Sequence, residues 1–311
     1  MTEEKTQKRK FDYKTALPEL LCLAITLITL LCANELRESV INGIKLSVFN
    51  IIPTLFPFLV LSDYWISVMS FGGDGFLGKA FRKFFKIDGI ALSAFLAGIF
   101  CGFPLGVKTA TDLYRSNRIT KHEAERLCGF INNPSLAFVI SGVGVGMYGS
   151  IEYGILLYIS VILSSVIVGI LFSKNSIKIS KGNEISEQKF DLVLSIKSAG
   201  LSSLTISSYI IFFSAVLGLL LAVTKSDLIV TVISPLLEVG NATSMIAKNT
   251  EFTSLASRAL CAFSLGFSGF SVHLQSFAFF PNEFSKAKYL MMKLIQGILC
   301  ALIILPLVSL L

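Results

Sequence analysis

The chain has 311 residues, of which 53% are hydrophobic and 15% charged, and its mean hydropathy is +0.74. Soluble domains carry about a quarter charged residues, so this composition excludes an ordinary soluble protein and indicates a multi-pass membrane protein. The formal net charge of +7 is better explained by basic cytoplasmic loops than by a nucleic-acid partner, and no nucleic acid is expected.

The first 15 residues are polar and basic and contain acids, and no small-residue cleavage site follows them. We therefore expect a cytoplasmic tail before an uncleaved helix rather than a signal peptide. The six cysteines lie mostly in apolar stretches without metal-ligand spacing, so we expect small buried side chains and neither a metal site nor a cofactor.

Six apolar runs are long enough to cross a bilayer, which takes roughly 17 to 25 residues. They are residues 16–33, 48–69, 131–147, 153–172, 201–223 and 294–311. If the N-terminus is inside, most of the 27 Lys and Arg residues fall in cytoplasmic segments. The sequence therefore predicts a cell-membrane protein with both termini in the cytoplasm.

Two further apolar segments, near 91–117 and 254–280, are interrupted by Gly-Phe-Pro and Gly-Phe-Ser. Breaks at matching positions in two halves are typical of transporter substrate sites, so both segments are predicted to be re-entrant hairpins. Chance similarity among Gly-rich apolar segments is the alternative. The predicted fold is an all-α polytopic membrane protein with two inverted-topology repeats, each of three transmembrane helices and one re-entrant helical hairpin.

The predicted domains follow from this order. They are a cytoplasmic tail (1–15), membrane repeat 1 (16–147), the first span of repeat 2 (148–172), a cytoplasmic linker (173–200) and the remainder of repeat 2 (201–311).

Two cytoplasmic helices are also predicted. Residues 76–85 alternate aromatic and basic side chains, which is typical of a helix lying at the headgroups of the bilayer. Thr120 and Glu123 form a capping box at the start of a short amphipathic helix, 121–130.

Polar groups near the first tip are candidate substrate ligands. Glycine and proline end helices there, and helix N-termini attract anions. A lysine at membrane depth is costly and typically functional, although Lys108 could instead reach the cytoplasmic interface. The candidates at this tip are Gly102, Pro104, Gly106, Lys108 and Thr109.

The remaining candidates lie in other apolar runs. The Asn pair before a proline predicts an irregular helix start facing a cavity, with helix capping as the alternative. The serines of the second tip could equally serve helix packing, and His273 could simply bond a carbonyl. These candidates are Asn132, Asn133, Ser135, Ser207, Ser268, Gly269, Ser271, His273 and Gln275. Asp63 is the candidate for coupling to H+ or Na+, unless it merely faces water.

Residues 102–149 resemble a known signature. The tip (Gly102, Pro104, Gly106, Lys108), the helix (Thr120, Glu123, Ala124, Arg126, Leu127) and the span (Phe130, Asn132, Gly142, Gly144, Gly146, Met147) are similar to the YlbJ-like family of sporulation integral membrane proteins. That family belongs to the group sharing the nucleoside transporter/FeoB Gate (nucleoside-recognition) domain. Phe103, Val107 and residues 133–135 depart from the pattern.

The resemblance implies the hairpin architecture of concentrative nucleoside transporters, but not that the substrate is a nucleoside. We expect a secondary transporter of a small polar solute, nucleoside-like or an organic anion, across the bacterial cytoplasmic membrane, linked to sporulation. The alternative is a non-transporting membrane assembly factor in spore or envelope formation. No Ser-His-Asp or paired-carboxylate arrangement is found, so no enzyme is predicted. The expected partners are the solute and the lipid bilayer, and a homo-oligomer is compatible with the sequence.

Overall fold

The described part of the structure, a computed structural model, contains helices and no strands, which confirms the all-α prediction. The described residues are 13–53, 55–57, 59–61, 75–173, 190–250 and 254–309.

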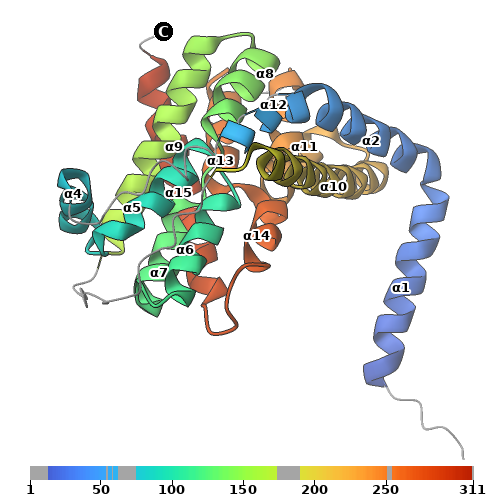
Figure 1. The fold of residues 1–311 in the computed structure, drawn as a ribbon. Helices are drawn as coiled ribbons and strands as arrows, with labels where there is room; N and C mark the ends of the chain where they lie inside the picture. Colours follow the sequence, from blue (N-terminus) through green and yellow to red (C-terminus); the bar gives the residue numbers. More distant parts are fainter. Residues whose placement is uncertain are drawn as a thin grey trace, which may run out of the picture.

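Four helices in the described ranges are long and apolar enough to cross a membrane. They are α9 (Ile151–Leu171), α10 (Leu192–Thr224), α13 with α14 (Ser254–Phe267 and Gly269–Phe277) and α15 (Lys286–Val308). A fifth candidate is a pair bent by 83°, in which α1 (Tyr13–Leu31) is followed by α2 (Ala33–Leu46) and the π-helix η1 (Ser47–Ile51). Helix α1 stands away from the helical body (Figure 1).

The chain turns back on itself inside the segment 91–117. After the short η2 (Gly89–Ala91), α5 (Leu92–Phe100) and α6 (Leu105–Arg115) lie against each other. A Cβ atom added to Gly106 would be only 2.8 Å from the Cα of Gly98. Gly98 in turn touches the Ile131 carbonyl. These glycines let the two short helices pack as a hairpin, as the sequence predicts for this segment.

The next span is interrupted at its start. Helix α7 (Lys121–Ile131) ends before the non-helical residues Asn132–Ser135, and the chain continues as the π-helix η3 (Phe138–Val145) and α8 (Gly146–Tyr148). This is the irregular start that the Asn-Asn-Pro sequence predicts.

The second hairpin lies elsewhere than predicted. Helices α11 (Asp227–Leu237) and α12 (Val239–Lys248) are joined at Glu238, whose backbone is extended. Asn249 Nδ2, after the end of α12, donates to Thr231 Oγ1 near the start of α11 at 3.4 Å. Such a contact requires the chain to reverse at Glu238.

The predicted hairpin at 254–280 is wrong. Helices α13 and α14 follow one another as a single apolar element, Ser254–Phe277, interrupted at Ser268. Ser268 and Gly269 both have positive φ, yet Ser268 N still donates to the Ser264 carbonyl at 2.8 Å. The hydrogen-bond ladder is therefore broken over one turn without a reversal of the helix direction.

The same order of elements occurs twice. A hairpin, an interrupted helix and a long apolar helix appear first as α5/α6, α7/η3 and α9, and again as α11/α12, α13/α14 and α15. In this order α9 closes the first series, although residues 148–172 are predicted to open the second half. The inverted orientation of the two halves stays a prediction.

Two predicted cytoplasmic segments are described in part. The linker 173–200 is shorter than predicted, because α10 begins at Leu192, where Asp191 Oδ1 accepts from Val193 N at 2.9 Å. Residues 174–189 lie outside the described ranges. Helix α4 (Phe76–Phe85) forms where an interfacial helix is predicted, with Phe81 and Phe85 buried and Lys79 exposed.

Candidate functional site

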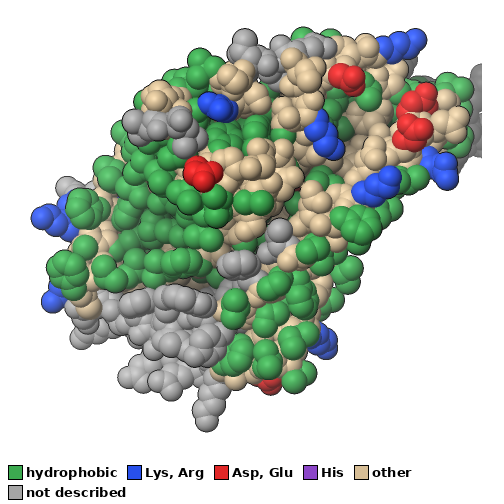
Figure 2. All heavy atoms as spheres, turned by 90° about the horizontal axis from the view of Figure 1, so that it is seen from above, with side chains coloured by type: hydrophobic (Ala, Val, Ile, Leu, Met, Phe, Trp, Pro, Cys, Tyr) green, Lys and Arg blue, Asp and Glu red, His purple; other side chains and the backbone are tan. Residues whose placement is uncertain are grey.

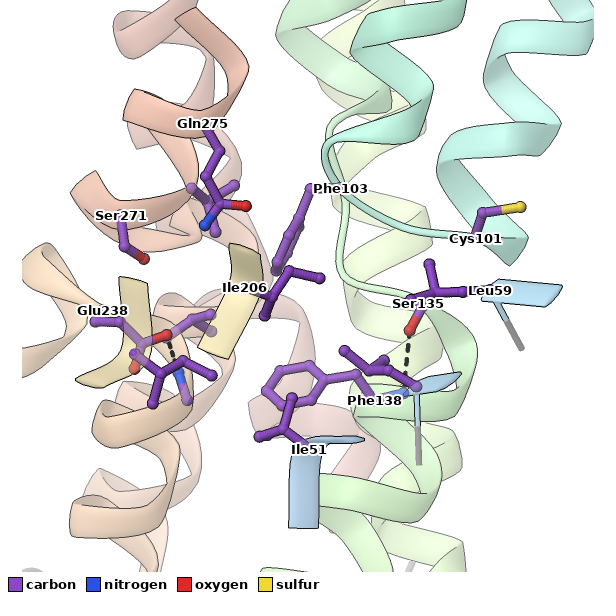
Figure 3. A pocket seen from close by; sticks show the side chains of 15 residues that line it. Ile51, Leu59, Cys101, Phe103, Ser135, Phe138, Ile206, Glu238, Ser271 and Gln275 are labelled. Atoms are coloured by element: carbon purple, nitrogen blue, oxygen red, sulfur yellow. Dashed lines mark hydrogen bonds between the residues drawn. The ribbon is translucent and has the colours of Figure 1, made fainter. Parts of the chain in front are cut away.

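A small cavity of about 30 Å³ lies where the two hairpin tips meet the two interrupted helices. Figure 3 shows its lining from all of these elements, together with α10 and the segment after α2. The lining residues are Ile51, Leu55, Leu59, Cys101, Phe103, Ser135, Phe138, Ile206, Ile210, Glu238, Val239, Gly240, Ser271, Val272 and Gln275.

Three predicted ligands line this cavity. Ser135 comes from the break after α7, while Ser271 and Gln275 come from α14 on the opposite wall (Figure 3). The Gln275 Oε1 atom is buried and has no hydrogen-bond partner. A buried amide oxygen without a donor is unfavourable, so a bound donor group would be stabilised there.

Glu238 supplies the carboxylate of the cavity. Its side chain is 3% exposed, and its two oxygens accept from Gly240 N at 2.8 Å and from Asn241 N at 2.6 Å. Asn241 Nδ2 donates to Oε2 as well, at 2.9 Å. The carboxylate thus caps α12 while it faces the cavity. Our sequence analysis missed it because Glu238 lies between the predicted span 201–223 and the predicted hairpin 254–280, although an acid directly after the apolar run of α11 was a usable signal.

Each hairpin tip lies against the break of the helix that follows it. A Cβ atom on Gly102 would be 2.5 Å from Ser135 N, and one on Gly269 would be 3.0 Å from Glu238 N. Both glycines have φ near +75°. Gly102 and Gly269 therefore let the backbones of tip and break approach closely beside the cavity, although neither glycine is among its lining residues.

A fully buried polar network connects the first break to α15. Lys293 Nζ donates to the Asn132 carbonyl and to Gln296 Oε1, each at 2.7 Å. Gln296 Nε2 donates to Asn133 Oδ1 at 2.7 Å. All four residues are 0% exposed. The two predicted asparagines therefore join the first half of the chain to the second.

The network continues into α14. Asn132 Nδ2 donates to Ser276 Oγ at 2.9 Å and to the Tyr289 hydroxyl at 2.5 Å. The Tyr289 hydroxyl is also hydrogen-bonded to His273 Nδ1 at 3.1 Å. His273 Nε2 and Asn132 Oδ1 are buried without a partner. Asn132 Oδ1 can therefore accept a further hydrogen bond, while His273 Nε2 can donate or accept one according to the tautomer of the ring.

Lys293 was missed by our sequence analysis. The predicted span starts at residue 294, which leaves Lys293 in the preceding loop with Lys286 and Lys288, but α15 begins at Lys286 and buries Lys293 completely. Among the described residues, no carboxylate lies within 4.0 Å of its Nζ atom. A buried lysine without a countercharge is costly, and such residues inside membrane proteins typically mark functional sites.

The other candidates lie away from the cavity lining. Lys108 is exposed on α6, which favours the interfacial alternative, and Thr109 Oγ1 donates to the Leu105 carbonyl at 3.0 Å. Ser207 on α10 is buried with an unpartnered hydroxyl, and Ser268 Oγ donates to the Leu265 carbonyl at 3.2 Å. Pro104 and Gly106 belong to the tip and start of α6. Asp63 lies outside the described residues.

The arrangement offers both donors and acceptors to a polar solute. Hydroxyl, amide and carboxylate groups face the cavity between the aromatic rings of Phe103 and Phe138. Within the described ranges, no group of three or more His, Cys, Asp or Glu side chains could hold a metal ion.

Comparison with known proteins supports the membrane class. The chain is similar to the sporulation integral membrane protein YlbJ of Bacillus subtilis (strain 168), with 24% identity over 301 residues that cover 82% of this chain and 73% of the relative. This similarity confirms the YlbJ-like resemblance, and together with the apolar helices it identifies a multi-pass integral membrane protein. No protein-family model and no solved structure matches the chain. The relationship to the Gate domain therefore stays a prediction.

Proposed function

We propose that this relative of a sporulation integral membrane protein is a secondary carrier of a small polar solute, which binds between the two hairpin tips. The observation that carries the proposal is the convergence of four helix interruptions on one cavity, which is mostly apolar but presents hydroxyl, amide and carboxylate side chains. In lipid, non-helical backbone is tolerated only where it is buried in protein or lines a cavity, and discontinuous helices mark the binding sites of many carriers.

The lining suits a small solute with both donor and acceptor groups. Gln275 Oε1 and Glu238 can accept hydrogen bonds, and the hydroxyls of Ser135 and Ser271 can do either. The apolar side chains around them exclude water and strengthen these contacts. The acceptors suit the hydroxyl and amide donors of a nucleoside-like solute, whereas an organic anion would bind through the hydroxyls of Ser135 and Ser271.

Binding requires the tips to separate. The cavity of about 30 Å³ holds little more than a water molecule, for which roughly 10 to 15 Å³ suffices. The described conformation is therefore closed around the site. Movement of the Glu238 tip relative to the Phe103 tip would enlarge the cavity, as alternating access requires.

The test is uptake into proteoliposomes that contain the purified full chain. Labelled nucleosides, nucleobases and organic anions would be offered with and without H+ and Na+ gradients. We expect uptake of one solute class, reduced about tenfold or more by Gln275→Ala, since each lost hydrogen bond to a polar group in a closed site weakens recognition.

Ser309→Ala is the matched control, because this exposed serine donates only to the Pro306 carbonyl near the chain end. It should transport like the unmodified protein. If no solute is taken up by protein that is folded and monodisperse, the carrier proposal fails and the assembly-factor alternative gains.

A further inference from the structure

A second and larger cavity, of about 500 Å³, opens between α2, α8, α10 and α12. We call it the vestibule. Its polar lining includes Asn42, Lys45, Ser214, Asn241, Ser244 and Lys248. Figure 2 views the molecule from the end where α2, α8 and α12 lie in Figure 1, and shows a broad hydrophobic surface on the left, with Lys and Arg side chains on the right and along the left edge.

The charge in the vestibule is of one sign. Lys45 and Lys248 both line it and are exposed, while no Asp or Glu is among its lining residues. Among the described residues, no carboxylate lies within 4.0 Å of either amine. Two unneutralised lysines beside apolar walls concentrate the field in the cleft and raise the local concentration of anions.

The floor of the vestibule is also the wall of the central cavity. Asn241 lines the vestibule, Glu238 lines the central cavity, and Asn241 Nδ2 donates to Glu238 Oε2 at 2.9 Å. Ser214 Oγ holds the same carboxamide by a hydrogen bond of 2.9 Å to Asn241 Oδ1. One hydrogen-bonded side-chain cluster therefore contributes a residue to each of the two spaces.

We infer that the vestibule is the entry site for a small soluble carboxylate or phosphate anion, and that the Asn241–Glu238 pair forms the barrier between this entry site and the central cavity. The inference rests on the proposed carrier function and narrows its solute to the anionic class. A neutral solute gains nothing from the two lysines, whereas an anion is attracted before it reaches the barrier.

The experiment measures the binding of probe anions to the purified full chain in a neutral detergent. Ligand-dependent melting would be recorded with succinate, inorganic phosphate and, as the neutral probe, uridine, since binding to the native state raises the melting temperature. We expect succinate or phosphate to bind and the double variant Lys45→Gln/Lys248→Gln to bind it about tenfold or more weakly. Lys197→Gln removes one exposed lysine of α10 outside the vestibule and should bind normally.

Two sources of the same chemistry must be distinguished, because lipid headgroups also carry phosphate. A parallel arm adds phosphatidylglycerol to the detergent micelles. Stabilisation by free succinate or phosphate that depends on the two lysines supports the inference. Stabilisation by the lipid alone overturns it, as does unchanged anion binding in the double variant or no anion binding to the unmodified protein.

The uptake assay separates this inference from the carrier proposal. If a neutral solute is transported and the double variant transports it equally well, the carrier stands and the anion site is rejected. If anions bind through the two lysines but nothing crosses the membrane, the anion site stands and the carrier is rejected.

Discussion

At the scale of single residues, two glycines hold the hairpin tips against the interrupted helices. Gly102 has φ of +76° and Gly269 has φ of +75°, in the left-handed region that residues with a Cβ rarely adopt. At both positions an added Cβ atom would also meet backbone of the adjacent element. The backbone conformation and the close approach together require glycine.

Gly102→Ala should therefore lower the free energy of unfolding by more than the conformational cost alone. That cost is roughly 1–2 kcal/mol for a left-handed residue, and the contact with Ser135 adds to it. Gly149→Ala is the matched control, since Gly149 has φ of +67° but an added Cβ would meet nothing within 4 Å. Thermal unfolding in detergent measures both, and equal destabilisation would contradict the proposed tip contact.

Asn132 is the residue on which the buried network depends most. Asn132→Ala removes the donor to the Tyr289 hydroxyl and to Ser276 Oγ and leaves an empty space at the break. We expect a loss of about 1–3 kcal/mol, the usual cost of leaving buried polar groups unpaired. Asn42→Ala, at an exposed asparagine of α2, should change stability by less than about 0.5 kcal/mol. If chemical denaturation gives a similar decrease in the free energy of unfolding for both variants, the buried network does not stabilise the protein more than an exposed side chain does.

Polar residues inside apolar runs were the informative sequence signal at this scale. Asn132, Ser271 and Gln275 stand out in this way and lie in the network or at the cavity. Lys293 was hidden because it follows two other lysines near the start of a span. Helix α15 begins at Lys286, several residues before the predicted span, and therefore includes Lys293. Sequence periodicity does not fix where a helix begins, so the burial of Lys293 was not predicted.

At the scale of elements, the residues at which helices begin and end were predicted better than which helices pack together. The capping box at the start of α7 forms as predicted, with Glu123 N donating to Thr120 Oγ1 at 3.3 Å and Thr120 N donating to Glu123 Oε2 at 2.8 Å. Local sequence suffices for such a feature. The second hairpin was placed in the wrong segment because Gly-Phe-Ser permits either a kink or a reversal, and only contacts distant in sequence decide between them.

Thr120→Ala should destabilise α7 by about 1 kcal/mol, because the backbone N–H of Glu123 loses its acceptor. Thr120→Ser retains the hydroxyl and should cost at most a few tenths of that. Hydrogen exchange at the first turn of α7 reports on this directly. If exchange in residues 121–124 is unchanged by the alanine, the cap does not stabilise the helix.

At the scale of the whole molecule, the two series of elements meet along the polar network and the central cavity. The sequence predicts two halves that each contain a hairpin, but it matches residues 91–117 with 254–280, whereas the second hairpin is α11/α12. The orientation of the halves in the membrane is predicted only from the charges of the loops. The distribution of lysines beside the spans predicts which side of the membrane each loop faces, but not how the helices pack against one another.

The sidedness can be measured with cysteine labelling. In a background with Cys22→Ser and Cys32→Ser, which removes the two cysteines that are not buried, Asn42→Cys would report on the vestibule face and Ser116→Cys on the end of α6. With the predicted N-terminus inside, an impermeant maleimide added to intact cells should label Asn42→Cys and not Ser116→Cys. The reverse pattern would invert the topology, and labelling of both would argue against two opposite faces.

The network around Lys293 also constrains how the halves could move apart. It joins Asn132 and Asn133 on one side to Ser276, Tyr289, Lys293 and Gln296 on the other. Pulling these groups apart in a dry interior would cost about 1–3 kcal/mol for each group left unpaired, and more for the ammonium. Separation of the halves therefore requires that water replace the partners as they part. If the protein opens as the proposed carrier function requires, the entry of water between the two halves should therefore set the height of the free-energy barrier.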